Sequence, residues 1–270
     1  MAFMGDVMSP APFWHNGPAP GAFYNFPGNA SNLNTSNHSP QDFKAHSASP
    51  ITTTTTVIGV KFDRGCVIAG DTLGSYGSLA RFRDCPRILK VNDLILLGSG
   101  GDYADFQYLK DIIEQKIIDE KCIGDGLQLK PRSLHCWLTR VLYNKRSKMD
   151  PLWSNYIVAG IQDGETFLGA VDKLGTAYED AAIATGLGAY MATPLLREQG
   201  RWRMDTIVLK NVFFSFFRAL VRKCMEVLYY RDARAFQRYQ LGVVTSDGVV
   251  IEDVAEVKPN WSLAHMIPMK

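Results

Sequence analysis

The stretch TTTTTVIGVKFDRGCVIAGD, Thr52 to Asp71, decides the fold of this 270-residue chain. Its five threonines lead into two runs rich in β-branched residues, 57–62 and 66–70, which Asp63-Arg64-Gly65 separates. Such runs favour strands, and a glycine between two of them is typical of a tight hairpin. We therefore predict an antiparallel hairpin and expect Gly65 to adopt a positive φ.

A threonine at the mouth of this hairpin and Asp71 at its far end form a pattern that is typical of self-processing hydrolases. In such enzymes an activated hydroxyl acts as the nucleophile. Glycine precedes none of the five threonines. The stretch therefore indicates a hydrolase fold that has lost its chemistry, although a threonine run before a strand also follows from β-propensity alone.

The rest of the chain groups strands with strands and helices with helices. Apolar periodicity predicts helices at about 103–121, from Pro131 onwards, near 190–197 and near 219–230. Short apolar runs predict strands at 94–97, 155–161, 167–171, 240–245 and 248–251. This order favours the α+β class, with two antiparallel sheets stacked face to face between helix layers, a four-layer αββα sandwich.

Composition argues against several classes of protein. The net charge of +2 is too small to indicate nucleic-acid binding, and the basic cluster at 145–148 is interpreted as a solvated helix end. The five cysteines include no C-x-x-C pair, so they predict neither a zinc site nor a disulfide framework. There is no signal-peptide pattern, and the apolar cluster at 212–217 is too short to span a bilayer. We expect a soluble, unsecreted chain without metal or membrane.

We divide the chain at residue 50. Residues 1–50 hold seven of the 13 prolines and only three charged side chains, so they bury too little apolar surface to fold alone. We predict a mostly disordered leader, whose aromatic residues are either docking points for a partner or without a role. Residues 51–270 form one domain with a C-terminal tail.

Two further classes of site find little support. The glycine-rich segment 98–101 lies after a predicted strand and before a helix, as a dinucleotide-binding loop would, but Tyr103 occupies the place of the third glycine. The five histidines contain no i, i+4 pair, which disfavours a metal site, and His135 is interpreted as a packed or rim residue. We expect no cofactor, and an unrelated nucleotide-binding enzyme stays as an alternative.

Four strings identify a family. They are GSYGSLARF (74–82), GDYADFQ (101–107), RSKMDPLW (146–153) and YYRDAR (229–234). Together they resemble the proteasome beta-subunit family of threonine peptidases, and within it the type-4 branch at the seventh position of the beta ring. The resemblance extends from about Thr55 to the C-terminus and implies the Ntn-hydrolase fold.

The resemblance also locates the family's catalytic positions. In active members a Gly-Thr bond is cut autocatalytically, and the released threonine uses its own amino group as the base. The nucleophile's position falls on Thr55, the aspartate on Asp71 and the lysine on Arg87. Two serine positions fall on Gly186 and Ala235, which have no hydroxyl.

We predict that no residue of this chain is catalytic. Thr54 stands where active members have glycine, and Arg87 cannot replace a lysine that titrates near neutral pH. Losing members of a unit that acts together costs about 10⁴ to 10⁶ in rate. Asp71, Asp232 and Gly101 match the family and are interpreted as structural relics. The alternative is an active threonine-type endopeptidase subunit.

For a non-catalytic chain, the resemblance implies a structural role in the proteasome core particle, supporting ring assembly for ubiquitin-dependent degradation in the cytoplasm and nucleus. Its expected partners are beta subunits of the same and the opposite ring and alpha-ring subunits, with assembly chaperones as further candidates. The tail at 261–267 is expected to reach the opposite ring. The apolar segment 200–217 departs from the family, and the sequence leaves open both a new interface and a gene-model error.

Overall fold

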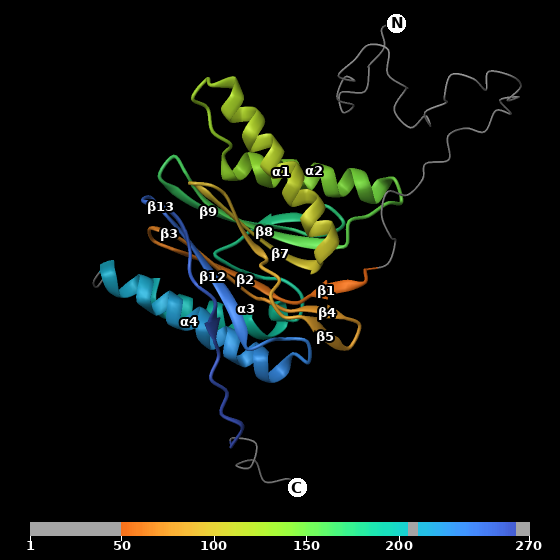
Figure 1. Ribbon diagram of the computed structural model, residues 1–270. Helices are drawn as coiled ribbons and strands as arrows, with labels where there is room; N and C mark the ends of the chain where they lie inside the picture. Colours follow the sequence, from red (N-terminus) through yellow and green to blue (C-terminus); the bar gives the residue numbers. More distant parts are fainter. Residues whose placement is uncertain (1–49, 205–209, 263–270) are drawn as a thin grey trace, which may run out of the picture. The chain divides into compact units, whose positions relative to one another are not determined.

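The computed structural model describes residues 50–204 and 210–262, and Figure 1 shows their strands and helices. These residues lie in one compact unit, Lys44–Lys270. The predicted leader up to residue 49 and the tail from residue 263 lie outside the described residues, so the division at residue 50 stays a prediction.

The described strands form two antiparallel sheets. The first has the order β10 (Ala177–Glu179), β9 (Glu165–Val171), β8 (Ser154–Gln162), β7 (Ile95–Asp102), β1 (Thr52–Thr54), β4 (Gly74–Tyr76) and β5 (Leu79–Phe82), with β6 (Ile88–Asn92) also paired to β7. The second has the order β11 (Ala182–Ala184), β2 (Val57–Phe62), β3 (Gly65–Asp71), β12 (Arg238–Thr245) and β13 (Gly248–Ile251), with β14 (Ala255–Glu256) also paired to β12.

Four helices accompany the sheets in the described part of the chain: α1 (Tyr103–Ile123), α2 (Pro131–Ser147), α3 (Gly188–Met204) and α4 (Lys210–Arg231). Helix α1 begins where the Asp102 carboxylate accepts a hydrogen bond from the amide of Ala104, and it ends at Gly124, which has a φ of 69°. Helix α2 begins with Pro131, whose missing N–H would have no intrahelical partner there.

Three apolar layers separate the sheets and helices. Alternate residues of β7, β8 and β9 pack under α1 and α2, while alternate residues of β2, β3 and β12 pack against α3 and α4. The remaining inward residues, such as Ile68, Leu96 and Ile157, fill the layer between the two sheets. The period-2 alternation of the strands thus gives each sheet two buried faces. The predicted α+β sandwich is confirmed.

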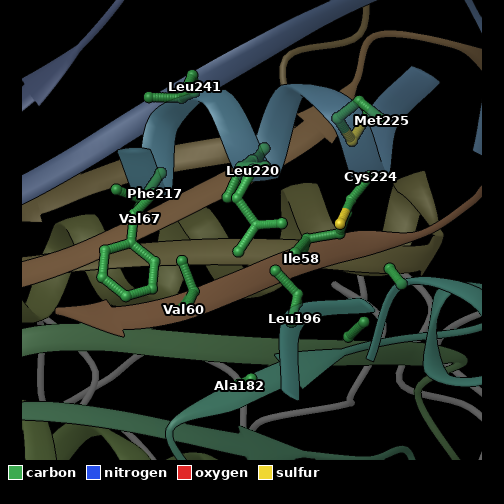
Figure 2. Close-up of a cluster of buried hydrophobic side chains, with 14 of the residues drawn as sticks. Ile58, Val60, Val67, Ala182, Leu196, Phe217, Leu220, Cys224, Met225 and Leu241 are labelled. Atoms are coloured by element: carbon green, nitrogen blue, oxygen red, sulfur yellow. The ribbon is translucent and has the colours of Figure 1, made fainter. Parts of the chain in front are cut away.

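Figure 2 shows the layer beneath α4, where Leu220 and Cys224 lie over Ile58 and Val67. Phe217 is buried in the same layer, and its ring stacks on Phe62 with centroids 6.3 Å apart. The C-terminal end of the apolar segment 200–217 is therefore core. The origin of the rest of that segment stays open.

The predicted hairpin at 57–70 is present, but the expectation for Gly65 was wrong. Gly65 is the first residue of β3 and has no positive φ. A Cβ there would lie 2.0 Å from the carbonyl oxygen of Val244 in β12, so glycine is required by close approach of the neighbouring backbone. The positive φ that we expected occurs instead in the β8–β9 turn, at Asp163 and Gly164.

No helix in residues 50–204 and 210–262 has both the length and the apolar character needed to cross a bilayer.

Substitution of Gly98 tests the packing of the two sheets. A Cβ at Gly98 would lie 2.7 Å from Val57 Cγ1 and 2.9 Å from Ile68 Cγ2, both in the opposing sheet. We expect Gly98→Val to lower the free energy of unfolding by about 2 kcal/mol or more, because the core is overpacked. Urea denaturation of the purified chain measures the change. Ala177→Val, on the exposed strand β10, is the control and should stay within about 0.5 kcal/mol of wild type.

The Cys66 thiol gives a second prediction, for alkaline pH. It is buried between the sheets and donates to the carbonyl oxygen of Phe167 at 3.3 Å, and burial raises the pKa of Cys66 from 9.0 to about 12. Between these values the unfolded chain has lost the proton that the folded chain keeps. Stability therefore falls as pH rises above the unfolded value.

We expect the loss of unfolding free energy between about pH 8 and about pH 10 to be smaller in Cys66→Ala than in wild type, by about 1.4 kcal/mol. Cys122→Ala removes an exposed thiol and should lose as much stability as wild type. Equal losses in Cys66→Ala and wild type would contradict the prediction.

Candidate functional site

The segment before Thr55 is built into the first sheet. Strand β1 lies between β4 and β7, with Thr53 opposite both Ser75 and Asp102. The hydroxyl of Thr54 also donates to the carbonyl oxygen of Gly101 at 2.8 Å. The chain then passes through Thr55 and Thr56 into β2 of the second sheet. In the full-length chain the Thr54–Thr55 peptide bond lies at the start of the crossing between the two sheets.

Arg87 lies beneath this crossing and is almost completely buried, with 1% of its surface exposed. Its Nε donates to the carbonyl oxygen of Asp71 at 2.8 Å. Nη1 donates to the carbonyl oxygens of Thr55 at 2.8 Å and Ser99 at 3.2 Å. Nη2 donates to the carbonyl oxygen of Thr56 at 3.1 Å and to the Asp71 carboxylate. These five bonds use all five N–H groups of the guanidinium.

Asp71, 2% exposed, completes the buried pair. One carboxylate oxygen accepts from Arg87, and the other accepts from the Thr55 hydroxyl at 3.1 Å and from the amide of Phe236 at 3.0 Å. Burial raises the pKa of Asp71, while Arg87 and these hydrogen bonds oppose the rise. Because all three partners are donors, the geometry satisfies the ionised carboxylate.

The segment around Gly186 also faces the crossing. The hydroxyl of Thr56 accepts from the amide of Gly188 at 3.0 Å, and Thr185 Oγ1 accepts from the amide of Val57 at 2.9 Å. Gly186 itself is exposed with a φ of 58°, and a Cβ there would lie 3.8 Å from Thr56 Oγ1. The position where the family has a serine is therefore near the site but carries no polar side chain.

The loop after α4 forms another side of the site. Asp232 accepts from the amide of Arg234 through its carboxylate, and its carbonyl oxygen accepts from the amide of Ala235 at 3.1 Å. The Arg234 guanidinium donates to the hydroxyl of Thr53 at 3.2 Å. The turn therefore has its own hydrogen bonds and also binds β1.

Gly101 is held by backbone geometry. Its φ is 104°, and a Cβ would lie 2.3 Å from the carbonyl oxygen of Trp153. Glycine is therefore required for structural reasons alone, whatever its role in relatives.

The structure thus brings the positions that the resemblance indicated into one region, through Thr55, Asp71 and Arg87, with the Gly186 and Asp232 loops beside them. Three contributors were missed from the sequence: the Thr56 hydroxyl, the Thr185 hydroxyl and the amide of Phe236. Of these three, only Thr185 could have been found from the sequence, because it is next to Gly186, a position that the resemblance had already indicated. A backbone amide cannot be recognised from the type of residue that carries it.

The nucleotide-binding alternative loses its structural basis. Residues 98–101 lie inside strand β7, where a Cβ at Gly98 would meet the opposing sheet and one at Gly100 would lie 2.8 Å from the Thr55 carbonyl oxygen. They form no phosphate-binding loop. His135 packs in α2 against Phe167 and hydrogen-bonds the carbonyl oxygen of Ala170, as a packed residue should. No group of three metal-ligating side chains occurs in the described parts of the chain.

Comparisons with known proteins agree with this fold and site. The family described as proteasome subunit matches residues 51–244. The chain belongs to the proteasome subunit family.

Individual relatives narrow the assignment. "Proteasome subunit beta type-4" of Xenopus laevis is 49% identical over 251 residues, which are 93% of this chain and 96% of the relative. The proteins of the same name in Drosophila melanogaster and Arabidopsis thaliana are 42% and 34% identical, over 95% and 80% of this chain and 95% and 84% of the relatives. Within the family, the chain falls in the beta type-4 group.

Substitution of Arg87 tests the buried hydrogen-bond set. Lysine has three N–H donors, so Arg87→Lys leaves at least two of the five acceptors without a partner. We expect a loss of about 2 kcal/mol or more in unfolding free energy, measured by urea denaturation. Arg83→Lys, four positions earlier on the exposed surface, is the matched control and should change little. Equal stability of Arg87→Lys and wild type would show that the hydrogen-bond set contributes nothing.

Proposed function

We propose that this chain is a non-catalytic, structural beta subunit of the proteasome core particle, which supports ring assembly for ubiquitin-dependent protein degradation. The observation that carries the proposal is the position of the Thr54–Thr55 peptide bond. The bond follows a strand that is paired on both sides, which supports an intact bond. An intact bond leaves Thr55 without the α-amino group that active members of the family use as the base. Thr54, and not a glycine, precedes Thr55, so the backbone lacks the freedom needed for a strained turn at this bond.

The environment of Arg87 supports the same conclusion. A guanidinium stays protonated at any physiological pH, and here each N–H group already has an acceptor. Arg87 therefore holds three parts of the backbone together and has no proton to exchange with a nucleophile. Gly186 and Ala235 offer no hydroxyl to orient a base.

The histidine with a described environment does not replace the missing base. His135 packs in helix α2, on the far side of the first sheet from the layer between the sheets. Asp71 accepts a hydrogen bond from the Thr55 hydroxyl; burial raises the pKa of Asp71, while its bonds to Arg87 and Phe236 stabilise the charged carboxylate and oppose that rise.

Other proteasome subunits are partners of this chain because its family forms a complex of subunits. We further propose that these partners are beta neighbours in the same ring, a beta subunit in the opposite ring and alpha subunits, with assembly chaperones as additional candidates. The expected site of action is the cytoplasm and nucleus. Trp261 at the start of the tail packs edge-on against Tyr230 of α4, with centroids 5.1 Å apart.

A covalent probe tests whether this chain lacks peptidase activity. In purified core particles, a threonine-directed inhibitor should label active beta subunits and leave this chain unmodified, because Thr55 lacks a liberated amine. Particles that carry Thr55→Ala should hydrolyse peptides at the wild-type rate. Labelling of Thr55, together with loss of one peptidase activity in Thr55→Ala, would favour the alternative of an active threonine-type endopeptidase. The labelled active subunits in the same particle are the internal control.

A further inference from the structure

The β4–β5 hairpin carries large apolar side chains that this chain leaves exposed. Tyr76, Leu79 and Phe82 are 47%, 60% and 41% exposed, and all four residues of β5 are exposed. Strand β5 ends the first sheet, so one of its edges has no strand partner among the described residues. An edge strand with this composition is costly to leave in water.

The strand register places these side chains on one face. Tyr76 lies opposite Leu79, and Gly74 lies opposite Phe82, with a bulge between the two pairs. Gly74 and Tyr76 are two residues apart on β4, so they share a face, and their partners share it with them. Thr52 lies opposite Tyr76 on the other side, so the apolar face continues onto β1. We call Tyr76, Leu79, Arg81 and Phe82 the hairpin patch.

Arg81 gives the hairpin patch its charge. The bulge places its guanidinium over two rings, 5.4 Å from the centroid of Tyr76 and 5.1 Å from that of Phe82. Neither Arg81 nor Arg83 forms an ion pair within the described ranges 50–204 and 210–262. The strand at the opposite edge of the sheet, β10, has its charge paired within the chain, because Glu179 forms an ion pair with Arg132 at 3.6 Å. A guanidinium that lies over an aromatic ring can still donate its N–H groups to a carboxylate.

We propose that the hairpin patch binds a neighbouring proteasome subunit. The contacting surface of that subunit presents an apolar side chain beside a carboxylate. The proposal rests on the proposed function as a ring subunit. The apolar face supplies the desolvated centre, and Arg81 supplies a preorganised donor for the acidic group. The positive charges of Arg81 and Arg83 favour an acidic surface on the partner. This chain's own leader fits less well, because it has only two acidic residues, Asp6 and Asp42.

Competition between tagged variants and wild type tests the proposal in cells. The readout is a ratio of two fractions. The first is the tagged fraction of this subunit in purified core particles, and the second is its tagged fraction in the unassembled pool. Leu79→Glu should lower this ratio at least tenfold, because it buries a charge against an apolar surface. Leu79→Met keeps the apolar volume and should match wild type. Arg81→Glu should lower the ratio more than Arg81→Lys does.

A Leu79→Glu chain that assembles as well as wild type would overturn the proposal while leaving the proposed function intact. Absence of the wild-type chain from core particles would instead refute the proposed function.

Photocrosslinking covers the case in which Leu79→Glu fails to fold. A benzophenone side chain in place of Leu79, in purified core particles, should crosslink to one other subunit at a peptide that contains Asp or Glu. A crosslink to residues 1–49 of the same chain would overturn the proposal, since the leader would then occupy the hairpin patch. So would the lack of any intersubunit crosslink.

Discussion

The buried ion pair of Arg87 and Asp71 is the interaction on which the rest of the site depends. A buried guanidinium is costly unless every N–H finds an acceptor, and here the acceptors come from the β1–β2 crossing, the end of β3 and strand β7. The pair therefore joins the two sheets where the chain passes between them. In an active relative the same place would hold a lysine and a free amine. In this chain the guanidinium of Arg87 occupies that place, and each of its N–H groups has an acceptor.

The same constraint explains the glycines around the site. Gly100 allows β7 to approach the carbonyl oxygen of Thr55, and Gly101 allows the backbone of Trp153 to approach β7. Both belong to the stretch that brings Ser99 within reach of Arg87. This close approach is needed whether or not the site is catalytic, because the scaffold's own carbonyl groups must satisfy the buried cation. Structural demands can thus maintain these glycines independently of catalysis.

The sequence predicted the layers well because strand and helix periodicities are local. It also placed Thr55, Asp71 and Arg87 together, through the family resemblance. It could not predict that Arg87 would bind four carbonyl oxygens, because backbone acceptors leave no mark in a side-chain pattern. The short strands β1, β4, β5, β10 and β11 were missed for a related reason: with three or four residues each, their pairing depends on distant strands. Gly65 was misread because close approach and positive φ both select glycine.

We propose that the bond before Thr55 stays intact, so that Thr55 has no free α-amino group to act as its base. N-terminal sequencing of this chain, taken from purified core particles, tests it most directly. The account predicts a first residue upstream of Thr55, with β1 still present in the assembled subunit. A mature chain that begins at Thr55 would contradict it, because the α-amino group would then be available beside Asp71.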